Sequence, residues 1–156
     1  MAAWLLKTSR APAELVPGWE PGQERRLQRC VRRSYRLDLM AHGQPCLLWL
    51  SGPREPGVHA VGRVLAAADD PGTLDPPGPP DRQPAVEVAL TLLAHPVPRA
   101  VLLAHPGFRD AEVVRMAAGS NPSYLTPRQL AAVEDVLAGA GDEPGGRQAP
   151  PTTVPR

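Results

Sequence analysis

The sequence predicts an α+β protein built on a small curved sheet or barrel with a cleft at one rim. An apolar strand over residues 46–50 ends on Trp49, and Ser51 and Gly52 follow it. A large aromatic residue beside such a small polar turn can supply one wall of a pocket. The next predicted strand, residues 58–66, carries Gly62 at its centre, and a glycine inside a strand marks a bend or a close approach.

Three further segments complete the predicted N-terminal half. Residues 3–7 are apolar and of strand length, and residues 12–22 contain three prolines and two glycines, so we expect a loop or a short helical turn there. Residues 24–40 carry apolar side chains at near-helical spacing, which predicts that part of this segment is an amphipathic helix.

The C-terminal half alternates strand and helix signals. Residues 85–93 alternate apolar and polar side chains, as in a half-buried strand. We expect a short helix over 98–103, because proline is tolerated in a first turn, and a short strand over 112–116. A longer helix follows, whose start is marked by a cap, a first-turn proline and a capping-box glutamine, and whose end is marked by a glycine. These residues are Thr126, Pro127, Gln129 and Gly139.

The length of 156 residues fits one domain with its own core. Residues 69–83 are rich in Pro, Gly and Asp, and we expect a mobile surface loop there. We assign residues 1–138 to the domain and residues 139–156 to a disordered tail, because the tail is rich in Pro and Gly.

Several functional classes lack any signal in the sequence. Cys30 and Cys46 have no metal or redox spacing, and we expect a cytoplasmic protein because no secretory signal accompanies them. No segment has the length of a membrane span. The four histidines are scattered, and no hydrolase, metal or nucleotide-binding motif occurs. We therefore expect a monomeric binding protein rather than an enzyme, with no catalytic residue, metal or cofactor.

Charge is the one compositional feature that indicates a partner. The net charge is only +1, but six arginines fall within residues 25–36. Arginine forks match phosphate oxygens, although a charge run is often only a solvated surface. Trp19, Tyr35 and Trp49 lie close to this run in sequence, and aromatic rings beside arginines suit unstacked bases; core packing remains the alternative for each ring.

Four segments in order make the chain similar to the EVE domain of the PUA-like superfamily, which is related to the YTH readers of methylated adenine. They are Trp4–Ser9, Arg33–Met40, Leu48–Gly62 with its Trp-Leu-Ser-Gly turn and Pro-Gly-Val-His-Ala-Val-Gly run, and Gly119–Thr126 with its Asn-Pro pair. The resemblance covers about residues 3–138. It implies a curved, mixed PUA-like β-barrel flanked by short helices, with a pocket for a modified base near one barrel mouth.

The resemblance also implies which residues form the site. The polar segment after the first strand, the Trp-x-Ser-Gly turn and the Asn-Pro pair match the family pattern. Arg29 stands where the family commonly has a Trp that stacks on the base, and Gln44 stands where it has Asp. Either Arg29 or Trp19 could supply the missing stacking surface. The predicted base pocket is Lys7, Thr8, Ser9, Trp19, Arg29, Trp49, Ser51, Gly52, Asn121 and Pro122, and the predicted phosphate contacts are Arg25, Arg26, Arg32, Arg33 and Arg36.

Three functions follow as hypotheses. The first is a reader of a modified base in DNA or RNA. The second is a general RNA-binding module of PUA type, for which the arginine run alone argues. The third is an enzyme acting on nucleotides. The sequence offers this hypothesis no nucleophile, no metal cluster and no paired carboxylates.

Overall fold

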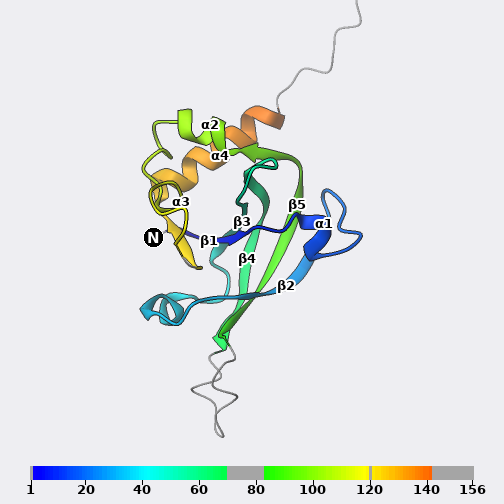
Figure 1. The fold of residues 1–156 in the computed structure, drawn as a ribbon, viewed down its shortest axis with the longest axis vertical. Coiled ribbons are helices and arrows are strands. Elements are labelled where there is room, and N and C mark those ends of the chain that lie inside the picture. The colour runs from blue at the N-terminus through cyan, green and yellow to red at the C-terminus, as the bar shows by residue number, and fades with distance from the viewer. Residues whose placement is uncertain (1, 70–82, 120, 142–156) are drawn as a thin grey trace, which may run out of the picture.

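A computed structural model describes residues 2–69, 83–119 and 121–141 (Figure 1). The predicted loop over 69–83, apart from its end residues, and the part of the predicted tail beyond residue 141 lie outside these ranges. The described strands are β1 Ala3–Thr8, β2 Glu24–Cys30, β3 Pro45–Leu50, β4 Gly57–Asp69, β5 Ala85–Pro98 and β6 Ser123–Leu125. The described helices are α1 Pro12–Leu15, the 3₁₀ helix η1 Tyr35–Leu39, α2 Arg99–Ala104, α3 Glu112–Arg115 and α4 Pro127–Gly141.

The strands form one mixed sheet in the order β2-β5-β4-β3-β1-β6. β1 and β3 are parallel, and the other pairs are antiparallel. Because β1 and β3 are parallel, Thr8 and Leu50 end at the same edge, and the backbone N–H of Ser51 donates to the Thr8 carbonyl over 2.8 Å. This α+β arrangement is the predicted fold class.

The sheet curves strongly but strand pairing does not close it into a barrel, since β2 and β6 remain its two edges. The chain just beyond β2 nevertheless reaches the chain just before β6. The Arg32 N–H donates to the Asn121 carbonyl over 2.8 Å. We call this contact the seam.

Gly62 marks a close approach of two strands, as its position inside a strand predicted. It pairs with Leu90 across β4 and β5, and a Cβ atom at this position would collide with the backbone carbonyl of Ala89. Only glycine allows the two long strands to approach this closely.

Apolar side chains alternate between the two faces of the sheet, and each face has its own core. The inner core, on the concave face, contains Trp4, Leu6 and Leu48 together with Leu27 and other buried residues. The outer core contains Leu5, Leu47, Trp49 and Phe108, and the helices α2 and α4 lie over it (Figure 1). Strands β1 and β3 are therefore buried on both faces.

The prediction of a helix within residues 24–40 is wrong for the first half of this segment, which forms strand β2. Leu27 and Val31 are four residues apart, a spacing that fits one face of a helix and also one face of a strand. In the structure Arg25 and Arg29 occupy the half-buried positions on either side of Leu27, while Glu24, Arg26 and Gln28 are exposed. The aliphatic stems of these arginines thus take the place of apolar residues on the inner face. The sequence therefore does not show the alternation of apolar and polar residues that is typical of a strand.

The C-terminal predictions are mostly confirmed. Thr126 and Gln129 form the predicted capping box, with the Thr126 N–H donating to Gln129 Oε1 over 2.9 Å and the Gln129 N–H donating to Thr126 Oγ1 over 3.3 Å. Gly139 does not end α4, which continues to Gly141, so the folded unit extends past the predicted boundary at 138. The strand predicted over 112–116 is wrong, because Glu112–Arg115 is the helix α3. Within the described residues, no helix is long and apolar enough to cross a membrane.

Candidate nucleic-acid interface

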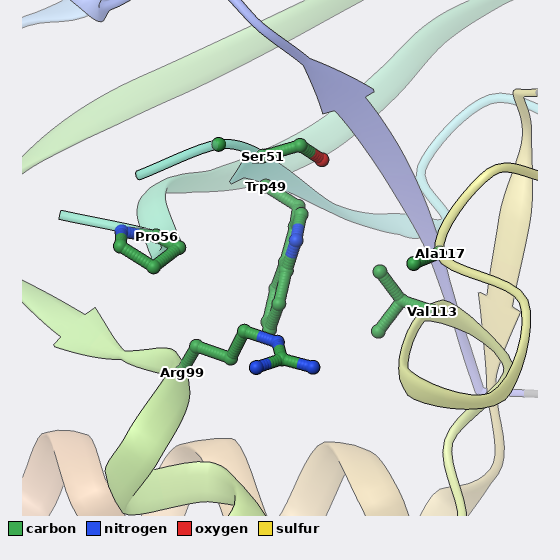
Figure 2. A pocket seen from close by; sticks show the side chains of 7 residues that line it. Trp49, Ser51, Pro56, Arg99, Val113 and Ala117 are labelled. Carbon is green, nitrogen blue, oxygen red and sulfur yellow. The ribbon is translucent and has the colours of Figure 1, made fainter. Parts of the chain in front are cut away.

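The structure distributes the predicted pocket residues over several places. Trp49, Ser51 and Gly52 line a cleft of about 250 Å³ on the outer face of the sheet (Figure 2). The other residues of the cleft wall are Pro56, Arg99, Val113 and Ala117. The remaining predicted residues lie along the end of β1, next to the seam, or inside the inner core.

Trp49 is a wall of the cleft and also part of the outer core. A register shift between Leu48 and Trp49 separates it from the preceding pairs with β4. Its side chain is only 3% exposed, and its ring stacks on Phe108 with centroids 6.0 Å apart and planes at 12°. Phe108 therefore supports one face of the indole and fixes its orientation toward the cleft.

Arg99 is a cleft residue that the sequence reasoning missed. It opens α2, and its backbone N–H donates to the Pro56 carbonyl over 2.8 Å. Figure 2 shows its guanidinium beside the edge of the Trp49 ring. Within the described part of the chain, no hydrogen bond or ion pair engages that guanidinium. No local signal distinguishes Arg99 from other surface arginines, because its neighbours in the cleft come from distant segments.

Lys7 supports the cleft wall rather than pointing into the cleft. Its buried ammonium donates to the carbonyls of Met116 and Ala117 over 3.4 Å each and to that of Gly119. Burial lowers the pKa of Lys7, and the negative charge of Glu112 acts in the opposite direction. Lys7 thus fixes the segment that follows α3, including Ala117 of the cleft.

Asn121 uses its side-chain amide on the backbone of β1. The Lys7 N–H donates to Asn121 Oδ1 over 2.6 Å, and Asn121 Nδ2 donates to the Lys7 carbonyl over 2.8 Å. These bonds lie two positions beyond the last β1–β6 pair, Leu5 with Ser123. The Asn121–Pro122 peptide is cis, and Pro122 is buried. Both residues therefore hold the edge of the sheet, and the amide of Asn121 is already occupied.

Thr8, Ser9 and Arg10 form a turn beside the seam. Thr8 Oγ1 accepts from the Arg10 N–H over 3.1 Å, and Ser9 and Arg10 are exposed. Asn121, bonded to Lys7 and to Arg32, brings this turn next to the end of β2. We call residues 8–10, 29–32 and 121 the mouth.

Trp19 is not at the mouth. It is buried in the inner core, and its Nε1–H donates to the Gln23 carbonyl over 2.8 Å. Its ring packs among aliphatic residues, so the structure gives it the core role that was the alternative for each aromatic.

Arg29 lies at the mouth on the inner face of β2. Its side chain is half-buried, and its Nε is buried without a hydrogen-bond partner in the described residues. Burial is the main reason that the pKa of Arg29 is lowered; nearby Cys30 opposes the shift, and the cation of Arg10 adds to it. A buried guanidinium beside a second cation is stabilised when an anion or a hydrogen-bond acceptor binds.

The predicted phosphate contacts have different environments. Arg32 and Arg33 are exposed beyond β2, and Arg25 is half-buried with its Nε unpartnered in the described residues. Arg26 lies 3.8 Å from Glu87 at an exposed site. Arg36 instead forms a 2.7 Å ion pair with Glu112, and its hydrogen bond to that carboxylate raises the pKa of Arg36.

The described residues offer little for catalysis. None of their His, Cys, Asp and Glu side chains form a group of three able to hold a metal ion. His59 is buried and its Nε2 lies 2.7 Å from the Glu55 carbonyl. Burial raises the pKa of the Cys46 thiol to about 12, so this thiol stays protonated and unreactive at neutral pH.

Solved structures share this fold across nearly the whole chain. The human thymocyte nuclear protein 1 in complex with DNA containing 5-methylcytosine aligns with a TM-score of 0.60 and 21% identity, covering 92% of this chain and all of that one. The DUF55 domain of the same human protein aligns with a TM-score of 0.60 and 19% identity, covering 90% and 99%.

The chain has the DUF55 fold. A hypothetical protein from Leishmania major has it too, with a TM-score of 0.68, 16% identity, and coverage of 90% and 97%. These likenesses confirm the α+β fold that the sequence predicted. No protein-family model and no curated protein matches the sequence.

Proposed function

We propose that this chain is a nucleic-acid-binding module that takes one modified base of DNA at the mouth, with Arg29 as its stacking surface. The complex of human thymocyte nuclear protein 1 with 5-methylcytosine DNA supports this, because it places modified DNA on the same fold. The proposal requires no catalytic group.

The half-buried guanidinium of Arg29 is the observation that carries the proposal. Its Nε lacks a partner in the described residues, and burial beside Arg10 disfavours its charge. A guanidinium plane stacks on a base and donates to base or phosphate oxygens. A nucleotide at the mouth would therefore supply both the acceptor and the negative charge that the site lacks.

The exposed arginines around the mouth suit the flanking phosphates. Arg10, Arg32 and Arg33 lie on the two segments that meet at the seam. Their guanidiniums would hold the backbone on either side of the inserted base. Such contacts position the nucleic acid but carry no base identity.

The test compares labelled oligonucleotides that differ only in one base, 5-methylcytosine or cytosine, by fluorescence anisotropy. A label is needed because Trp19 and Trp49 are buried. We expect tighter binding of the methylated strand by the wild type. Arg29→Ala should weaken binding by roughly 5- to 150-fold, the equivalent of about 1–3 kcal/mol of stacking, and should reduce the preference. Arg29→Trp should retain binding and shift preference toward neutral methylated bases.

Arg99→Ala is the matched control, because it removes an arginine from the cleft instead of the mouth. Loss of the preference in Arg99→Ala, with Arg29→Ala unaffected, would place the base in the cleft. Identical weak and salt-sensitive binding of both oligonucleotides by the wild type would exclude base recognition and favour a general nucleic-acid-binding module. Repeating the titration with RNA separates the two polymers.

A further inference from the structure

The helix η1 carries an aromatic side chain that is unusually exposed. Tyr35 is 71% exposed, whereas Trp4, Trp19, Trp49 and Phe108 are all buried. Figure 1 shows η1, in cyan, projecting from the body of the sheet. A tyrosine ring held this far into solvent contributes little to the core.

A stack of side chains supports this ring from below. The Arg36 guanidinium carbon lies 5.0 Å from the ring centroid of Tyr124 on β6 and 6.0 Å from that of Tyr35. Arg36 thus contacts both an aromatic of the sheet and the exposed aromatic of η1, and a side-chain hydrogen bond with Tyr35 contributes to the raised pKa of Arg36. Cations in such positions are attracted by the ring quadrupole.

Arg36 is itself held in place from two directions. Its Nη1 donates to Glu112 Oε1 over 2.7 Å and to the Pro122 carbonyl over 2.9 Å. The Ser34 side chain caps η1 by accepting from the Arg36 N–H over 3.3 Å. The backbone that carries Tyr35 is therefore tied through its neighbour Arg36 to α3 and β6, which limits the movement of η1 when a ligand binds.

The surrounding charge identifies the class of ligand. Residues 29–36 contain four arginines. Arg32 and Arg33 are exposed just before η1. The acidic residues nearby are the exposed Asp38 of η1 and Glu112, which pairs with Arg36. An exposed aromatic ring among arginines matches an unstacked base with its phosphates. A protein partner would have to bury these charges.

We propose that Tyr35 is a stacking platform for an unpaired base flanking the base read at the mouth. This rests on the proposed function, because it places the same strand across both positions. Arg32 of the mouth is three residues from Tyr35, and three extended residues span at most about 10–11 Å. The platform therefore takes a base that lies close along the strand to the base at the mouth.

The experiment measures binding of single-stranded DNA that carries one 5-methylcytosine, with wild type, Tyr35→Ala, Tyr35→Phe and Leu39→Ala. Tyr35→Ala should bind roughly 5- to 150-fold more weakly, as expected for one lost stack. Tyr35→Phe should bind like the wild type, because it keeps the ring. Leu39→Ala is the matched control: it removes an exposed apolar side chain from the same helix and should change nothing.

Abasic substitutions then locate the platform along the strand. An abasic residue at the flanking position should weaken wild-type binding as much as Tyr35→Ala does, and it should add nothing in that variant. The methylated-to-unmethylated ratio should be the same in Tyr35→Ala as in the wild type, because stacking on this ring is tolerant of sequence.

The outcomes separate the two proposals. Unchanged affinity of Tyr35→Ala overturns the platform and leaves base reading intact. If Tyr35→Ala binds DNA more weakly than the wild type, and the wild type binds methylated and unmethylated DNA equally, the platform is supported and base reading is excluded. An equal loss in Leu39→Ala indicates an apolar protein-docking surface and overturns the platform, and a wild type that binds no oligonucleotide overturns both.

Discussion

At the scale of single residues, the amide of Asn121 acts as a piece of β-strand. It donates to and accepts from the backbone of Lys7, as a backbone amide does in an antiparallel pair. Because these bonds join the end of β1 to the seam, the side chain of Asn121 helps to determine the shape of the mouth.

Replacing this amide should destabilise the fold. We predict that Asn121→Ala lowers the free energy of unfolding by about 2–3 kcal/mol, since two hydrogen bonds are lost and the Lys7 N–H loses its acceptor. Urea denaturation measures this. The exposed Gln28→Ala should stay within about 0.5 kcal/mol of the wild type, and an Asn121→Ala protein as stable as this control would contradict the structural role.

The residue scale also shows how far the sequence could predict the site. The resemblance singled out the Asn-Pro pair and the polar turn after β1, and the structure places both beside the seam. It could not assign their roles. An amide that pairs with a strand and one that pairs with a base have the same spacing, and only the bonds between Asn121 and Lys7 distinguish them. Arg99 was missed because its neighbourhood is made by the fold.

At the scale of elements, the close approach of β4 and β5 depends on glycines in β4, of which Gly62 lies in the middle of the strand and Gly57 at its start. A side chain at Gly62 would collide with the Ala89 carbonyl, whereas Gly139 in α4 has open space around it. The two positions form a matched pair for the same substitution.

We predict opposite results for alanine at these two glycines. Gly62→Ala should destabilise the protein by more than about 3 kcal/mol or prevent folding, because backbone strands must move apart. Gly139→Ala should be neutral or stabilise it by up to about 1 kcal/mol through helix propensity. Thermal melts followed by circular dichroism compare them, and similar melting temperatures for the two variants would contradict the predicted strand approach.

Elements were predictable where the side chains obeyed one period. The alternation over β5 fits only a strand, and the capping box of α4 fits only the start of a helix. Strand β2 did not obey one period, because Arg25 and Arg29 bury their stems while Leu27 and Val31 fit either period. The wrong prediction for β2 and the candidate site have the same cause. Arg25 and Arg29 hide the alternating pattern of the strand in the sequence, and the same two arginines are half-buried on the inner face.

At the scale of the whole molecule, the net charge of +1 conceals a local concentration of arginine around the mouth. We predict a steep dependence of DNA affinity on salt despite this near-neutrality. If Arg10, Arg32 and Arg33 each engage a phosphate, the slope of log K against log salt should be about −2 to −3.

Single variants distinguish local from overall charge. Arg33→Ala should reduce the magnitude of the slope by about 1. Arg128→Ala makes the same change in net charge on α4, where the side chain bonds to the Pro106 carbonyl, and should leave the slope unchanged. Anisotropy titrations from 50 to 200 mM salt provide the measurement, and equal slopes for both variants would show that only overall charge matters.

The seam has a consequence for how a ligand could enter. The six strands are joined by ladders, but the hydrogen bond from Arg32 to Asn121 spans two segments that lie outside any ladder. Arg36 joins the same two segments through its bonds to Glu112 and to the Pro122 carbonyl. Widening the mouth would stretch these few contacts and leave every strand pair in register. If a base binds at the mouth as proposed, the site could therefore adapt to its size while the two cores stay packed.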